Sequence, residues 1–485
     1  NYPNETPFLT CTTGTDGAIL HLNGCNYIKI YGLEIGGHSA GKAYGILLDD
    51  CENHIVISNN HIHNLLTTKP GEHENGEANG ILLFGEGKTD ETSINNICIE
   101  NNNIHNNTTG WSETLSTSGN CKYVNVINNT VHDNTNIGID FYGNAKYCTV
   151  PAYDQPRYCV AAGNTVYNSI CSYAECAGLY LDGARDTIFE NNIIYGSMYG
   201  IEIGSEEGAK YSDYPVKNVV VKNNLIYNNT QAGLSVGGYD NDATGIVYNT
   251  KIYNNTIVNN GNSDYGVELG INKTSGTDIR NNIFYKDNDL ELIKVRFTED
   301  LAGDLTFKNN CYYSTRTASN FKVIRYGETF RGFDNWKTVS GETGIYENPN
   351  FGDEYSLLKN SPCIDAGDST AYSGKYDILS NERNINNIDI GCYEYNGSEV
   401  TTTTTVETSS ETTTTTTTKV TETSTESTTT ITTETTTVSE SSSETTTENA
   451  VGSALEWDFT DSNWTDKTAT TNKTMQSSFK PLLLF

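Results

Sequence analysis

Apolar and polar residues alternate in short segments along most of the chain. A glycine followed by an apolar, a variable and a second apolar residue, as in Gly178-Leu-Tyr-Leu, recurs at Gly45, Gly80, Gly138, Gly200, Gly233 and Gly266. Strict alternation over a few residues is typical of β-strands, and no stretch sustains the 3.6-residue apolar period of a helix. The pattern therefore predicts a protein built from short strands.

A second phrase, two asparagines followed by a variable and an apolar residue, recurs between these strands, with Gly163 replacing the first asparagine once. Its apolar residue stands at Ile62, Ile104, Val131, Val166, Ile194, Ile226, Ile257, Phe284 and Tyr312, at intervals of 27 to 42 residues. Such intervals are typical of solenoids. Asparagine suits the turns because it tolerates the left-handed conformation and can form ladders of side-chain hydrogen bonds. We therefore predict an all-β, parallel β-helix.

Residues 20–395 resemble the right-handed parallel β-helix proteins of the pectate lyase superfamily. The stretch "SPCIDAGDSTAYSG…RNINNIDIGCYEY" resembles the C-terminal cap of bacterial members. The resemblance implies a right-handed parallel β-helix (solenoid) domain over 1–396, with a cap at about 361–396. A terminal repeat must differ from the others because it shields the last open strand edge.

The remainder of the chain differs in composition. Residues 397–449 are dominated by threonine, serine and glutamate, which predicts a disordered linker. Such threonine-rich linkers resemble those that join modules in secreted polysaccharide-degrading enzymes, which implies a modular or cell-surface assembly. We interpret 450–485 as a fragment of a second module. Because the chain begins at Asn1 without a signal peptide, we expect a mature or truncated product of a secreted protein.

The net charge limits the classes of partner that the protein can bind. Thirty lysines and arginines stand against 61 aspartates and glutamates, a net charge of −31, which argues against binding nucleic acid or anionic membranes. No run of 18 apolar residues predicts a membrane span. Most of the twelve cysteines we interpret as small buried residues, although Cys148 with Cys159 and Cys171 with Cys176 flank loops that disulfides could close. We interpret the histidines beside the asparagine repeat as turn residues rather than metal ligands: His61, His63, His105 and His132.

Carboxylates gather at the variable position of the strand phrase. That position faces outwards if the two apolar residues fill the core. After Leu47 and Leu82 it is occupied by Asp140, Tyr180, Glu202, Ser235 and Glu268, and the following turns add Asn144, Asp182, Glu206 and Asp240. Coils stack about 4.8 Å apart, so we predict one acidic band along the outside of the solenoid. Like charges so close need a cation, a proton or a substrate between them.

One interpretation of this band is a polysaccharide lyase that cleaves a pectic or rhamnogalacturonan-type polymer of the plant cell wall by β-elimination. Ca²⁺, bound by Asp140, Asp182 and Glu202, would neutralise the substrate carboxylate. Arg157, placed over the band by the long loop from 141 to 159, would be the base, as arginine or lysine is in the superfamily. The paired-aspartate and lysine pattern of family 9 pectate lyases is not recognisable.

A second interpretation is a retaining glycoside hydrolase. "GLYLDG" followed by "GIEIGSE" resembles a stretch of β-helical β-xylosidases, which implies Asp182 as the nucleophile and Glu202 as the general acid. Adjacent coils about 4.8 Å apart suit the roughly 5–5.5 Å separation of carboxyl groups in a retaining mechanism.

A third interpretation is a non-catalytic, carbohydrate-binding solenoid on which aromatic rings stack against sugars. In all three cases we expect the substrate to contact side chains around the band, namely Trp111, Tyr153, Asp154, Tyr180, Glu206, Tyr239 and Asp240. The sequence leaves the three interpretations open.

Overall fold

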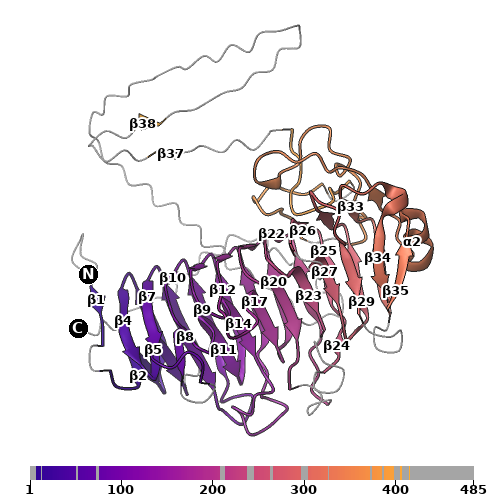
Figure 1. Ribbon diagram of the computed structural model, residues 1–485. Helices are drawn as coiled ribbons and strands as arrows, with labels where there is room; N and C mark the ends of the chain where they lie inside the picture. Colours follow the sequence, from indigo (N-terminus) through magenta and orange to yellow (C-terminus); the bar gives the residue numbers. More distant parts are fainter. Residues whose placement is uncertain are drawn as a thin grey trace.

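The computed structural model describes residues 7–397, 405–406 and 414–415, apart from 12–13, 51–52, 73–75, 208–212, 238–244, 263–265, 297–303, 326, 372–373 and 385–386. The described strands follow one another in coils along a single elongated solenoid, from the indigo N-terminal end to the orange end in Figure 1. Three sheets, named A, B and C here, run along its length.

Each coil contributes one strand to each sheet over most of the solenoid. Sheet A contains β1 (Phe8–Leu9), β4 (Glu34–Ala40), β7 (His61–Thr67), β10 (Asn103–His105), β13 (Thr130–His132), β16 (Thr165–Tyr167), β19 (Ile193–Tyr195), β22 (Leu225–Tyr227), β26 (Thr256–Val258), β30 (Ile283–Tyr285), β33 (Cys311–Tyr313) and β36 (Ile345–Tyr346). Sheet B contains β2 (Gly17–Asn23), β5 (Lys42–Asp49), β8 (Glu77–Gly85), β11 (Leu115–Gly119), β14 (Ile139–Tyr142), β17 (Ala177–Asp182), β20 (Tyr199–Gly204), β23 (Ala232–Val236), β27 (Val267–Ile271), β31 (Ile293–Val295), β34 (Lys322–Arg325) and β35 (Glu328–Arg331).

Sheet C contains β3 (Asn26–Tyr31), β6 (Asn53–Ser58), β9 (Ile94–Glu100), β12 (Cys121–Ile127), β15 (Arg157–Ala162), β18 (Arg185–Glu190), β21 (Val219–Lys222), β25 (Lys251–Tyr253), β29 (Thr277–Arg280) and β32 (Leu305–Lys308). A small parallel pair joins β24 (Val247–Tyr248) and β28 (Thr274–Ser275). The strands of the three long sheets pair in parallel, except that β35 turns back antiparallel on β34. The predicted all-β, parallel β-helix is confirmed.

The core consists of apolar side chains stacked in register from coil to coil. In sheet B, Ile139 pairs with Leu179 and Leu179 with Ile201, and all three side chains are fully buried. Burying one such side chain contributes about 1.5–3 kcal/mol. The two apolar positions of the strand phrase therefore hold the coils together, and the position between them is left to face outwards.

The asparagine phrase forms a ladder of buried side chains at the turn between sheets C and A. Asn102 Nδ2 donates to Asn129 Oδ1 at 2.9 Å, and the same bond recurs from coil to coil. The ladder ends where Asn310 Nδ2 donates to Glu342 Oε2 at 2.8 Å. The preceding asparagine of each pair is left-handed, as at Asn101 with φ 55°. The turn chemistry expected from the sequence is confirmed.

The C-terminal end of the solenoid is closed by α2 (Phe333–Ser340), whose buried Trp336 packs edge-on against Phe307 at a ring separation of 5.0 Å. The segment expected to be the cap instead folds back along the asparagine turns. Asp389 O accepts from Asn254 Nδ2 at 2.8 Å, and Arg383 donates to Asn223 Oδ1 at 2.9 Å. It covers the side of the last coils, whereas the helix covers their end.

Two short strands, β37 (Thr405–Val406) and β38 (Thr414–Thr415), pair antiparallel. The rest of the predicted linker and the fragment at 450–485 lie outside the described residues. Where the structure describes the chain, it contains no helix long and apolar enough to cross a membrane. Cys171 and Cys176 lie with their sulfur atoms 3.1 Å apart as thiols, whereas Cys148 and Cys159 donate to separate backbone carbonyls.

Candidate acidic site on sheet B

The outer face of sheet B carries the row of side chains that the strand phrase predicts. Asp140 pairs with Tyr180, Tyr180 with Glu202, and Glu202 with Ser235 on successive strands. Their neighbours along each strand point into the apolar core, so these four side chains face outwards. Asp182, two residues beyond Tyr180, lies on the same face. We call Asp140, Tyr180, Asp182, Glu202 and the turn residue Glu206 the acidic site.

Two carboxylates of the acidic site are buried although they lie outside the core. Asp140 is 1 % exposed and Asp182 is 3 % exposed. Asp182 Oδ1 accepts a hydrogen bond of 2.8 Å from the backbone N–H of Glu206, and the Tyr180 hydroxyl donates to Glu206 Oε1 at 3.2 Å. The turn after β20 therefore folds over the strands. Asp140 Oδ1 is buried without a hydrogen-bond partner among the described residues.

Burial and mutual repulsion favour the protonated forms. Burial, together with the charges of Glu175 and Glu206, raises the pKa of Glu202 to about 8. Burial, followed by the charges of Glu113, Asp182 and Glu206, holds the pKa of Asp140 well above its usual range. The pKa of Asp182 is raised by burial and by Glu206. Near neutral pH the site must therefore retain protons or bind a cation.

Glu113 belongs to this cluster but was not predicted. It lies in the insertion from 110 to 120, which the backbone bond from Thr114 N to Ile137 O ties to the neighbouring coil. Burial raises the pKa of Glu113 to about 7. The strand phrase could not identify this residue because it precedes β11 rather than lying on it. Together, these groups offer only oxygen atoms, the ligand type that Ca²⁺ prefers.

Arg157 differs from the expectation. It is the first residue of β15 rather than a loop residue, and it is 2 % exposed. Its guanidinium donates to Asp90 Oδ1 at 2.6 Å and to Asn120 Oδ1 at 3.0 Å, and it also bonds the carbonyl of Gln155. These bonds tie β15 to preceding coils. The prediction that Arg157 reaches over the acidic band from a loop is wrong, because the strand starts earlier than the loop length suggested.

The other predicted contact residues, apart from Tyr180 and Glu206, differ in their surroundings. Asp154 is buried and accepts hydrogen bonds from the backbone N–H groups of Lys146 and Cys148 at 2.6 and 2.9 Å, so it stabilises its own loop. Tyr153 lies against Arg157, with the guanidinium carbon 5.8 Å from the ring centre. The Trp111 ring lies 5.9 Å from that of Tyr173. Tyr239 and Asp240 lie outside the described residues.

Glu268 does not continue the acidic row. In β27, Gly270 rather than Glu268 pairs with Ser235, so the strand is shifted by two residues relative to the phrase. Glu268 is fully buried and accepts from Asn260 N at 2.9 Å and Asn260 Nδ2 at 2.6 Å, with Lys286 Nζ 3.6 Å away. The expectation that it faces outwards is wrong: its carboxylate ends a second, shorter asparagine ladder.

Comparisons with known proteins agree with this architecture. A family model described as "Right handed beta helix region" matches residues 157–346. The chain is 30% identical over 385 residues to "Uncharacterized protein YwoF" of Bacillus subtilis (strain 168), covering 75% of this chain and 78% of that protein.

Solved structures are more distant. The A-module of mannuronan C-5 epimerase AlgE4 of Azotobacter vinelandii is 15% identical, with a TM-score of 0.36 over 64% of this chain and 82% of that one. Pectate lyase Pel9A is 12% identical, with a TM-score of 0.35 over 81% of this chain and 87% of that one. The predicted right-handed parallel β-helix is confirmed.

Proposed function

Because the chain belongs to the family of right-handed parallel β-helix proteins that includes YwoF of Bacillus subtilis, we propose that it is a secreted enzyme that cleaves polysaccharides at the acidic site. The observation that carries this proposal is a row of carboxyl groups on the outer face of sheet B in which burial holds at least one proton near neutral pH. Hydrolysis of a glycosidic bond canonically uses a protonated carboxyl group beside an ionised one.

Glycoside hydrolysis fits the residues best. Glu202, with a pKa raised to about 8, would donate a proton to the leaving sugar oxygen. Asp182 accepts a hydrogen bond from the backbone N–H of Glu206, which partly offsets the rise in its pKa that burial causes. It would act as the nucleophile, or as the base that activates water. The two residues lie on adjacent strands, β17 and β20, and diagonal to one another, since Tyr180 pairs with Glu202 and Asp182 with Gly204.

Calcium-dependent β-elimination of a pectic polymer is the second candidate. The buried Oδ1 of Asp140, unpartnered within the described chain, favours a bound cation, and Asp140, Asp182 and Glu202 would supply the oxygen ligands. The base is harder to assign because Arg157 is bound to Asp90 and Asn120. In the row of sheet B that contains Glu202, Lys294 lies three coils further on, which is about 14 Å at about 4.8 Å for each coil. This lysine is therefore distant from Glu202.

The test incubates the full chain with xylan, α-glucan and pectate, each with Ca²⁺ or with EDTA. Hydrolysis would release reducing ends without ultraviolet absorbance and would tolerate EDTA, whereas elimination would give unsaturated products that absorb near 235 nm and would stop in EDTA. We expect Glu202→Gln and Asp182→Asn to abolish hydrolysis, and Glu86→Gln, an exposed glutamate beyond β8, to leave it unchanged. Binding without either product would support the non-catalytic interpretation and overturn the proposal.

A further inference from the structure

A cluster of histidines lies on the outer face of sheet A, which is a different face of the solenoid from the acidic site. His61 and His63 are on β7, His105 is on β10 and His132 is on β13, so none of the four occupies the turn position expected for it. The rings of His61 and His63 lie 4.5 Å apart, and that of His61 lies 4.8 Å from that of His105. Three imidazoles thus form a compact triangle across two coils.

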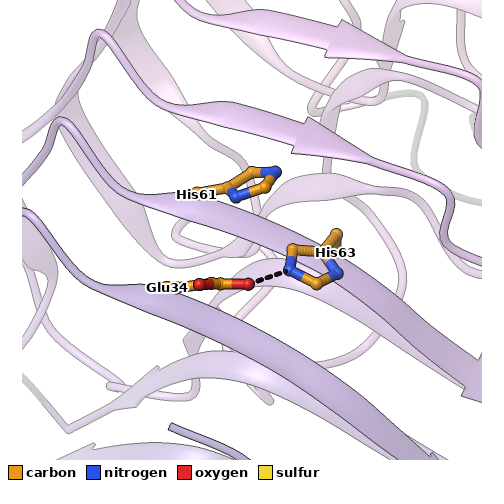
Figure 2. A group of neighbouring side chains, drawn as sticks. All are labelled: Glu34, His61 and His63. Carbon is orange, nitrogen blue, oxygen red and sulfur yellow. Dashed lines mark hydrogen bonds and ion pairs between the residues drawn. The ribbon is translucent and has the colours of Figure 1, made fainter. Parts of the chain in front are cut away.

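A carboxylate completes this group. Glu34 on β4 pairs with His61 on β7, and its Oε1 lies 3.1 Å from His63 Nε2 (Figure 2). Glu34, His61 and His63 each offer one ligand atom, and these atoms all lie within 4.8 Å of one another. Two ligands of a tetrahedral Zn²⁺ ion are separated by about 3.3 Å when each bond is about 2.0–2.1 Å long. Small rotations of the side chains would therefore suffice to bind one ion.

The nitrogen atoms of the cluster are also directed towards one another. His61 Nε2 lies 2.6 Å from His105 Nε2, so without a cation one ring must donate its proton to the lone pair of the other. His105 Nδ1 is buried and has no hydrogen-bond partner in the described part of the chain. Imidazole nitrogens that converge in this way suit a transition-metal ion.

We propose that Glu34, His61 and His63 bind a divalent transition-metal ion of the Zn²⁺ type, with His105 as a fourth ligand. The donor set favours Zn²⁺, Ni²⁺ or Cu²⁺ over Ca²⁺ because imidazole nitrogens outnumber oxygens. The Asn64 side chain lies 3.0 Å from His63 Nδ1 and orients that ring, as outer partners do in metal sites. The His63 side chain is 13 % exposed and that of Glu34 is 34 % exposed, so an ion can enter from solvent.

The site would link three successive coils, β4, β7 and β10, near the N-terminal end of the solenoid. An ion that binds only the folded state stabilises it by mass action. The metal would therefore cross-link these three coils, in addition to the backbone hydrogen bonds and side-chain packing that hold the strands of sheet A together.

The experiment uses the full chain, without a histidine tag and freed of metal by EDTA. Calorimetric titration with ZnCl₂ should show one equivalent bound, CaCl₂ should give no binding at this site, and Zn²⁺ should raise the melting temperature by a few degrees. Co²⁺ in place of Zn²⁺ should give the visible absorption of a tetrahedral nitrogen and oxygen site. His61→Gln and His63→Gln should each weaken Zn²⁺ binding at least tenfold.

The matched control is His132→Gln. This histidine stacks on His105 at 4.8 Å but bonds Asp133 and Asn103, so its loss should leave Zn²⁺ affinity unchanged. Glu34→Gln, which keeps the shape of the side chain, provides a second test if a histidine variant fails to fold. No saturable Zn²⁺ binding, or binding that survives both His63→Gln and Glu34→Gln in folded protein, would overturn the proposal.

Discussion

Replacing Glu202 with glutamine should change how the stability of the solenoid depends on pH. The pKa of Glu202 is raised from 4.5 to about 8 in the folded chain, with burial as the main cause. Below pH 4.5 the side chain is protonated in both the folded and the unfolded state, so it adds no pH dependence. Between 4.5 and 8 only the unfolded chain ionises, and the free energy of unfolding therefore falls as pH rises.

The size of the effect follows from the same values. At 1.36 kcal/mol for each pKa unit, the difference between 4.5 and about 8 sets an upper limit of about 5 kcal/mol. Glu202 is half-buried, and water screens its charge, so we expect about 1–2 kcal/mol. Glutamine cannot ionise. Glu202→Gln should therefore match the parent protein at pH 4.5 and exceed its free energy of unfolding by about 1–2 kcal/mol at pH 9.

Urea unfolding followed by circular dichroism at pH 4.5, 7 and 9, in buffer containing EDTA, would measure this difference from the midpoints. The exposed Glu86→Gln variant serves as a control for the loss of one negative charge and should show no such divergence with pH. A Glu202→Gln variant that is destabilised equally at every pH would refute the reasoning, since it would mean that the carboxyl group is held by packing or hydrogen bonds rather than penalised by burial.

Four further outcomes are expected. Ca²⁺ should raise the melting temperature at pH 8, and differential scanning calorimetry of Asp140→Asn should show most of that gain lost, because the unpartnered carboxylate is removed. Asn192→Ala should lower the free energy of unfolding in urea by about 3 kcal/mol, since it leaves buried ladder groups unpaired on both sides. Arg157→Lys should reduce thermal stability without changing the type of product in the glycan assay, because the guanidinium binds Asp90 and Asn120 rather than the acidic site. The hydrogen bond from Cys176 lowers the pKa of Cys171 to about 6, so its alkylation by iodoacetamide, followed by mass spectrometry, should speed up as pH rises through that value and then level off.

The sequence predicted the coils and much of the acidic site because both depend on local alternation. Ile201 and Ile203 must face inwards, so Glu202 between them faces outwards, and stacking then brings it beside Tyr180. The prediction for Glu268 was wrong because its strand is displaced by two residues, and only the pairing with the previous coil decides that register.

The predicted positions of Arg157 and of the histidines were wrong for a related reason. The length of the loop before β15 does not determine where pairing with β12 resumes, and it resumes at Arg157 itself. The histidines adjoin the asparagine turns in sequence, but the strands of sheet A begin immediately after the second asparagine, as at His61. Their approach to one another also depends on coils 42 and 27 residues apart, as the pairing of Ile62 with Ile104 and of Ile104 with Val131 shows. Local patterns carry no information on such separations.

The asparagine ladder has a direction. In each bond the amide group of one coil donates to the amide oxygen of the next, so the ladder is polar from end to end. An amide in the last position would still have hydrogen atoms to donate, whereas the carboxylate of Glu342 only accepts, from Asn310 and from the Tyr312 hydroxyl. Glu342 thus acts as a terminator. Coils can be duplicated or deleted before Glu342 without disturbing the end of the asparagine ladder. The number of coils in such a solenoid can therefore vary in evolution while one glutamate still ends the ladder.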